Sequence, residues 1–259
     1  MSNQVISRMK ESNIENSMTR EPETVVSNRG EGAQINVLHE DNHVIVVNKR
    51  PSDIVQGDKT GDVTMPDLIK EFLKDKYGKP GNVFCGVVHR LDRPTSGAVV
   101  FAKTSKALSR LNEQFREKDT RKVYWAVVEK APQQKTGSLV NYLLKNEKQN
   151  KAYVHQKEVA GSKRAELNYR QIAQSDKYTL LEVELYTGRH HQIRAQLAHI
   201  GCIIKGDLKY GAKRSNPDGS IHLHARYLEF IHPTSKEKIS ITAPVPDESL
   251  WQWFEAHLK

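Results

Sequence analysis

Apolar and polar residues alternate along the chain with two different periods, which predict separate strands and helices. Apolar segments within residues 35–49 flank a polar turn and predict a β-hairpin. Strands are predicted at 122–129 and at 180–186, where aliphatic and acidic residues alternate. A second hairpin is expected over 223–244, with its turn at 234–237.

Helical spacing of apolar residues predicts three helices, over 67–77, 104–118 and 189–200. Strands and helices are intermixed, and hairpins outnumber parallel crossovers. The sequence therefore predicts an α+β fold, with a mixed, mostly antiparallel central sheet and flanking helices.

The first 34 residues differ in composition from the rest of the chain. They contain no aromatic residue, few large aliphatic residues, and many Ser, Asn and Glu. Such a segment cannot bury enough apolar surface to offset the loss of chain entropy on folding. We expect residues 1–34 to be a disordered polar leader and residues 35–259 to form a single domain.

Several classes of protein are disfavoured by what the sequence lacks. It has no membrane-length apolar run and no secretory signal, and its two cysteines, Cys85 and Cys202, are far apart. A cytoplasmic location follows as the expectation. The sequence also lacks Walker, GxGxxG, GxSxG and HExxH motifs, so we expect no cofactor and no metal site.

The net charge of +9 is carried by the body of the chain. Residues 1–34 hold four basic and five acidic residues, so the other 225 residues carry a net +10. A basic body indicates an extended polyanion such as nucleic acid as partner. An ordinary basic surface is an equal alternative on charge alone.

The segment 86–104, "GVVHRLDRPTSGAVVFAKT", places charged residues between two strand-like runs. A buried unpaired carboxylate costs several kcal/mol, which is comparable to the net stability of a folded domain. Asp92 is therefore expected to be paired or near solvent. Pro94 and Gly97 impose a rigid bend that would present Asp92 at the edge of the sheet. The alternative is an Asx-turn or cap without catalytic function.

A second group of charged residues opens the predicted helix 189–200, in "TGRHHQIRAQL". His190 and Arg194 are spaced to share one helix face, and Arg189 is placed in the first turn. Basic residues at a helix start oppose the helix dipole, so an anion is expected nearby. A solvated basic face is the alternative.

Five separated motifs, in order and spacing, resemble the RluA-type pseudouridine synthases: "HRLDRPTSG", "KVYWAVV", "TGRHHQIRAQLAHIG", "IKGDLKYGAK" and "LHARYLEFIHP". The resemblance covers roughly residues 35–246. It implies an enzyme that isomerises uridine in RNA to its C-glycoside without a cofactor. It also implies Asp92 as the nucleophile, Arg194 as its basic partner, and Tyr124 as the residue that stacks on uracil and accepts the C5 proton. Whether Asp92 attacks C1′ or C6, or first takes the 2′-proton, stays open.

The resemblance also implies that Arg90 fills the space left by a flipped-out base, and that Arg189 binds phosphate. His89, Arg93 and His190 are expected to contact the RNA or the backbone near it. The residues that shape the pocket floor are expected to be Asp207, Tyr210 and Gly211.

The chain departs from the family pattern at His190, often Thr or Ser, at Gln196, often His, and at "KRPSDIVQ". Residues 1–34 are too short and polar for the extra RNA-binding module of many relatives. We therefore expect a tRNA or ribosomal RNA stem-loop as partner, no membrane association, no obligate protein partner and a monomer. One alternative is an RNA-binding or ribosome-assembly factor on the same fold. A metal-dependent nuclease is disfavoured because few carboxylates flank Asp92.

Overall fold

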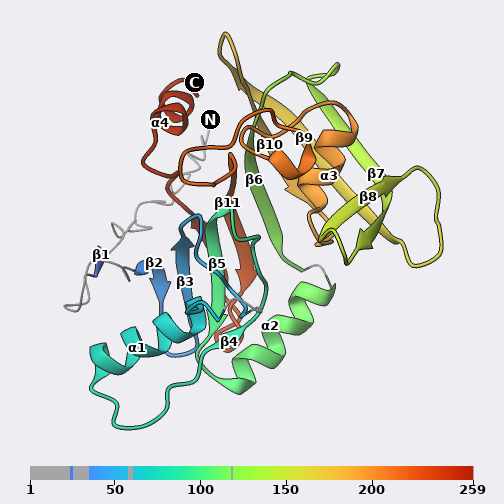
Figure 1. Ribbon diagram of the computed structural model, residues 1–259. Coiled ribbons are helices and arrows are strands. Elements are labelled where there is room, and N and C mark those ends of the chain that lie inside the picture. Colours follow the sequence, from blue (N-terminus) through green and yellow to red (C-terminus); the bar gives the residue numbers. More distant parts are fainter. Residues whose placement is uncertain (1–23, 26–34, 58–60, 118, 259) are drawn as a thin grey trace, which may run out of the picture.

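A mixed β-sheet runs through the whole computed structural model, which describes residues 24–25, 35–57, 61–117 and 119–258 (Figure 1). Its strands are β1 (Thr24–Val25), β2 (Ile35–Glu40), β3 (Val44–Lys49), β4 (Gly86–Val87), β5 (Ser96–Ala102), β6 (Arg121–Val128), β7 (Thr136–Asn146), β8 (Lys151–His155), β9 (Lys163–Gln174), β10 (Thr179–Leu185), β11 (Leu223–Ile231) and β12 (Lys238–Thr242). The helices are α1 (Met65–Tyr77), α2 (Ser105–Glu117), α3 (Gln192–His199) and α4 (Ser249–Ala256), with a short 3₁₀ turn η1 at Leu208–Tyr210.

The strand order is β1-β2-β3-β5-β11-β6-β10-β9-β7-β8, with β12 added on β11 and β4 on β5. Among the described strands, only the pairing of β11 with β5 is parallel. The expected α+β fold with a mixed, mostly antiparallel sheet is confirmed.

Both faces of the central strands are buried, because helices cover the sheet on two sides (Figure 1). In β3, Ile45 and Val47 pack in the core layer that holds α1, whereas Val44 and Val46 pack in the layer that holds α2. This alternation is the two-residue period of a strand. Near-continuous aliphatic sequence in β3 and β5 follows from burial on both faces.

The predicted hairpins are confirmed as β2–β3 and β11–β12, and the helices predicted at 67–77 and 104–118 are α1 and α2. The strand predicted before His89 is only the two-residue β4. Three strands, β7 to β9, were not predicted. Apart from Thr24–Val25, which pair with β2, the predicted leader lies outside the described residues.

The third predicted helix starts later than expected. It begins at Gln192, not at Arg189, because His191 has the left-handed φ of 51° and interrupts the helical path. Its residues from Gln192 to Leu197 are all buried, so α3 has no solvated polar face over that stretch.

Among the residues that the structure describes, no helix has the length and apolar character needed to cross a bilayer.

Candidate active site

A pocket of about 180 Å³ lies between the loop before β5, strand β6 and the start of α3. Such a volume is smaller than the roughly 300–1,000 Å³ of sites for drug-sized ligands and suits one small planar group. Its polar lining includes Arg90, Asp92, Tyr124, Arg189, His190, His191 and Arg194.

The loop that carries Asp92 is tied to the end of β3 by the buried amino group of Lys49, whose pKa burial lowers to about 7. Nζ of Lys49, at the end of β3, donates to the backbone carbonyls of Arg50 (2.9 Å), Arg93 (3.1 Å) and Thr95 (2.7 Å). The turn itself closes through the N–H of Thr95, which donates to the carbonyl of Asp92 at 3.0 Å. Three of these four hydrogen bonds, those to Arg93 and Thr95 and that within the turn, hold the loop that carries Asp92.

A glycine allows this loop to lie close to the centre of the sheet. Gly97 has a φ of 116° and pairs with Ala225 of β11. A Cβ at Gly97 would stand 2.4 Å from the carbonyl oxygen of Ala225, so no other residue fits without a backbone shift.

The carboxylate of Asp92 is paired with Arg194 and remains partly open to solvent. Nη1 of Arg194 donates to Oδ2 of Asp92 at 3.1 Å, and the Asp92 side chain is 26% exposed. The two residues are 102 positions apart in the chain. The expectation that Asp92 is paired or near solvent is met in both respects.

Arg194 is held in turn by a second carboxylate. Its Nε and Nη2 donate to the two oxygens of Asp207, at 2.7 and 2.8 Å, in the bidentate geometry that lysine cannot make. Both side chains are buried, at 5% and 1% exposure. Burial lowers the pKa of Arg194, but the hydrogen bonds and charge of Asp207, followed by Asp92, outweigh it and raise the pKa above the ordinary value.

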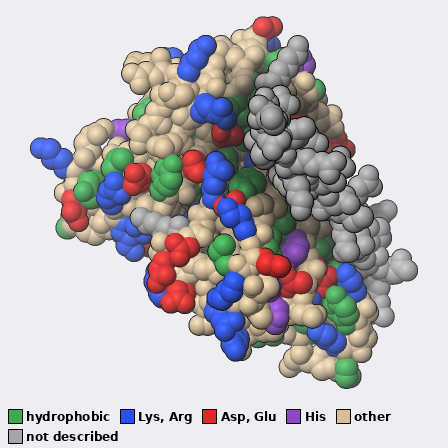
Figure 2. All heavy atoms as spheres, turned by 180° about the vertical axis from the view of Figure 1, so that it is seen from behind, with side chains coloured by type: hydrophobic (Ala, Val, Ile, Leu, Met, Phe, Trp, Pro, Cys, Tyr) green, Lys and Arg blue, Asp and Glu red, His purple; other side chains and the backbone are tan. Residues whose placement is uncertain are grey.

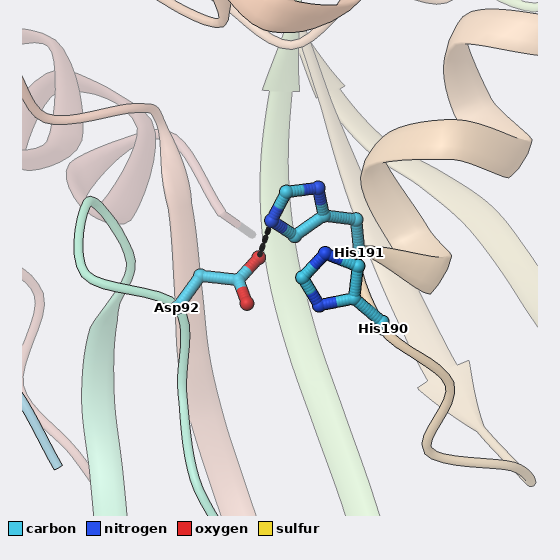
Figure 3. A group of neighbouring side chains, drawn as sticks. All are labelled: Asp92, His190 and His191. Atoms are coloured by element: carbon cyan, nitrogen blue, oxygen red, sulfur yellow. Dashed lines mark ion pairs between the residues drawn. The ribbon is translucent and has the colours of Figure 1, made fainter. Parts of the chain in front are cut away.

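The two adjacent histidines also face the carboxylate of Asp92 (Figure 3). Nε2 of His191 is 3.6 Å from Oδ2 of Asp92, and its Nδ1 is 3.1 Å from the hydroxyl of Tyr210. The rings of His190 and His191 stack with their centroids 3.8 Å apart. Burial lowers the pKa of His191 to about 3 despite the charge of Asp92, and it also lowers the pKa of His190. Both imidazoles are therefore neutral at pH 7.

Tyr124 enters the pocket from the middle of β6, between Val183 of β10 and Ala225 of β11. It is 8% exposed. Burial, and then the negative charge of Asp92, raise the pKa of its hydroxyl above the ordinary value, so the phenol stays protonated at neutral pH.

The other predicted arginines stand at the rim or point away. Arg90 is exposed at the pocket mouth and donates to Gln56 at 3.2 Å. Arg93 forms an ion pair with Asp62 at 3.0 Å, and Nε of Arg189 donates to the backbone carbonyl of Arg164 at 2.9 Å. Because Arg189 precedes α3, its expected position in the first helical turn is wrong.

His89 does not line the pocket. Its Nε2 accepts the N–H of Val100 at 3.1 Å, and its ring stacks on Phe115. Burial lowers the pKa of His89 to about 3, so the ring is neutral. The expected shared helix face of His190 and Arg194 is also wrong, because His190 lies before α3 and Arg194 is buried.

Three residues of the site were missed or underrated on sequence. Asp207 was expected only to shape the pocket floor, whereas it binds Arg194 directly. Lys49 was not singled out at all, and His191 was assigned no role in the reaction. A signal exists for Lys49, a charged residue that directly continues the apolar run of β3. None exists for His191, whose position depends on its left-handed backbone.

Comparison with known proteins connects this pocket to a family. The sequence profile described as RNA pseudouridylate synthase matches residues 43–199, which include Asp92, Tyr124 and Arg194. The chain belongs to the RNA pseudouridylate synthase family. It is thereby placed among the RNA pseudouridine synthases, which are isomerases that act on uridine in RNA.

Relatives from several bacteria support this assignment. The chain is 34% identical over 219 residues to an uncharacterized RNA pseudouridine synthase of Synechocystis, covering 82% of this chain and 66% of that one. It is 34% identical over 229 residues to the ribosomal large subunit pseudouridine synthase D of Xylella fastidiosa (83% and 67%), and 31% identical over 229 residues to synthase C of Vibrio cholerae (86% and 67%). It thus spans about two thirds of these relatives' length.

The fold is shared with a solved structure, human RNA pseudouridylate synthase domain containing 4. The TM-score is 0.72 at 23% identity, over 86% of this chain and 93% of that one. This similarity supports the pseudouridine-synthase fold.

Proposed function

We propose that this chain converts specific uridines in structured RNA to pseudouridine, with Asp92 as the nucleophile. The observation that carries this proposal is the carboxylate of Asp92, which faces the pocket while Arg194 holds it at 3.1 Å. The adjacent guanidinium pairs with the carboxylate and fixes its orientation, as a nucleophile requires. The bidentate contact of Asp207 fixes the guanidinium.

The reaction is an isomerisation in which the atoms balance without a cofactor. The N1–C1′ bond of uridine breaks, the uracil turns over, and C5 bonds to C1′. The proton on C5 leaves, and N1 gains one. Asp92 holds the detached fragment covalently, either at C1′ or at C6, or it first removes the 2′-proton; in each version its carboxylate is free at the end.

Tyr124 contributes as a protonated phenol in this scheme. A neutral phenol is a weak base, and its raised pKa disfavours a standing phenolate. We propose that its ring stacks on uracil and that its hydroxyl relays the C5 proton to the freed carboxylate of Asp92. Both residues line the same pocket.

The target base must leave the RNA stack to reach Asp92, at a cost of a few kcal/mol. Arg90 is exposed at the pocket mouth, where its planar guanidinium can fill the space that the flipped-out base leaves in the RNA stack. Arg189 and His190 line the same pocket, where they can contact the nucleotide. On the face seen in Figure 2, Lys and Arg are interspersed with Asp and Glu, so the described residues give that face no continuous basic surface.

The names of the relatives favour large-subunit ribosomal RNA as the substrate to test first, and tRNA as the second. RNA labelled with tritium at uridine C5 should release the label to water as the new C–C bond forms. Total ribosomal RNA and total tRNA are compared with the same amount of enzyme. Release from neither pool, with intact RNA binding, would reject the catalytic proposal in favour of an RNA-binding factor.

A monomer in the cytoplasm remains part of the proposal, and sedimentation of the full chain tests its oligomeric state.

A further inference from the structure

Three side chains that commonly ligate metals meet at the bottom of the pocket. Asp92, His190 and His191 each offer a ligand atom, and these atoms lie within 4.8 Å of one another. Figure 3 shows the carboxylate of Asp92 facing the two imidazole rings across a narrow gap. The sequence predicted no metal site, because it lacks HExxH and its two cysteines are not spaced as ligands.

The hydrogen bonds of Tyr210 allow His191 to bind a cation. The hydroxyl oxygen of Tyr210 accepts the N–H of Ala152 at 2.9 Å and lies 3.3 Å from the carbonyl oxygen of Ala152. These contacts fit two tautomers of His191: Tyr210 can donate to Nδ1, or it can donate to Ala152 and accept the Nδ1 proton of His191 at 3.1 Å. A bound metal selects the second tautomer. That tautomer leaves a lone pair on Nε2, pointing at Oδ2 of Asp92 from 3.6 Å.

In that tautomer two hydrogen-bond acceptors face each other without a proton between them, an arrangement that a cation stabilises. The hydrogen bond from the far ring nitrogen is also the outer-shell contact that metal-binding histidines generally have. Zinc bonds of about 2.0–2.1 Å place tetrahedral ligands about 3.3 Å apart, close to the observed 3.6 Å.

His190 supplies an independent observation. Its Nε2 is buried and has no hydrogen-bond partner among the described residues. Unpartnered buried polar atoms are uncommon and call for an explanation such as an ion. A ring nitrogen of His190 already lies within 4.8 Å of the ligand atoms of Asp92 and His191.

The local charge also suits a divalent cation. Asp207 neutralises Arg194 through two hydrogen bonds, so the buried cluster of Asp92, Arg194 and Asp207 keeps one net negative charge. Neutral imidazoles and one carboxylate form a donor set that prefers zinc and its neighbours to magnesium or calcium.

We propose that Asp92, His190 and His191 form a binding site for a divalent transition metal of the zinc type, and that the bound metal inhibits the enzyme. Inhibition rests on the proposed function, since a metal on Asp92 occupies the nucleophile. Metal binding itself does not rest on it.

The test is a titration of the full, tag-free chain with Co²⁺, followed by absorbance in the visible range, and with Zn²⁺, followed by calorimetry. His190→Thr and Asp92→Asn each remove one ligand. His199→Ala, an exposed histidine at the end of α3, is the matched control for adventitious binding. Thermal midpoints of all variants show whether each is folded.

One metal per chain is expected, with binding at least about tenfold weaker in both ligand variants and unchanged in the control. Zinc should abolish tritium release by the wild type, and a chelator should restore it. Absence of stoichiometric binding, or equal binding in the wild type, His190→Thr and Asp92→Asn, overturns the metal site. Binding as expected in a protein that releases no tritium when metal-free overturns the proposed function and leaves the metal site standing.

Discussion

The contact between Arg194 and Asp207 makes the sharpest prediction about how the site is held. Asp207→Ala removes the bidentate partner of a guanidinium that is 5% exposed. Arg194 keeps only its single hydrogen bond to Asp92 at 3.1 Å and stays enclosed in the core. The variant should be less stable, and its Arg194 should no longer hold Asp92 in one orientation.

The size of the effect follows from burial. Removing one partner of a buried ion pair costs about 3–5 kcal/mol, and the remaining contact with Asp92 favours the lower end, about 3 kcal/mol. For a domain of this size that corresponds to a thermal midpoint lower by about 6–12 °C. Asp207→Asn keeps the shape and one acceptor, so it should lose about half as much.

Circular dichroism melts and tritium release are measured on the same preparations. Glu166→Ala is the matched control, because Glu166 forms an exposed ion pair with Arg164 worth less than about 1 kcal/mol. Asp207→Ala should also lose at least about tenfold in activity. A midpoint for Asp207→Ala no lower than that of the control would refute the reasoning.

Three further predictions concern the rim, the loop support and pH. Arg90→Ala should change the free energy of unfolding by no more than about 0.5 kcal/mol. It should lower tritium release from a structured stem-loop at least about tenfold, and the loss on a short unstructured RNA should be smaller. Equal losses on both RNAs would contradict base flipping by Arg90. Lys49→Met should lower the free energy of unfolding in urea by about 3 kcal/mol, because three carbonyls each lose a hydrogen bond and only that of Arg93 keeps a second donor, the N–H of Ser52. A loss below about 1 kcal/mol would show that the amino group of Lys49 does not support the loop. Burial lowers the pKa of His89 to about 3 and of His224 to about 4 from 6.5, so the unfolded chain binds more protons below pH 6.5 and stability should fall as the pH drops from there toward 4. Each histidine contributes at most about 1.4 kcal/mol per pH unit to the slope of the unfolding free energy against pH. His89→Gln should make this slope shallower by up to that amount, and an unchanged slope would show that His89 does not contribute to it.

Local patterns predicted the elements whose burial follows one clear period. The hairpins β2–β3 and β11–β12 and the helices α1 and α2 are of this kind. Strand β7 was not predicted, because most of its residues are only partly buried or exposed and the sequence carries little apolar alternation. The start of α3 was misplaced, since the left-handed φ of His191 is imposed by its surroundings and not by residue type.

The residues that line the pocket were predicted from the family resemblance, but the geometry of the pocket was not. Asp92 and Arg194 are 102 residues apart, and no local pattern indicates that they touch. The contact of Asp207 with Arg194 likewise depends on how the segment before η1 packs beneath α3. His89 shows the limit of a motif, because it stands three residues from Asp92 and yet binds the backbone of β5.

Tritium release by Asp92→Asn tests the central claim most directly. The substitution keeps the side-chain shape and removes the charge and the nucleophile. Asp176→Asn, in an exposed turn, is the matched control. The account predicts that RNA labelled at uridine C5 loses tritium with the wild type and the control, and that Asp92→Asn binds the same RNA without releasing the label. Release by Asp92→Asn at a rate near that of the wild type would contradict Asp92 as the nucleophile.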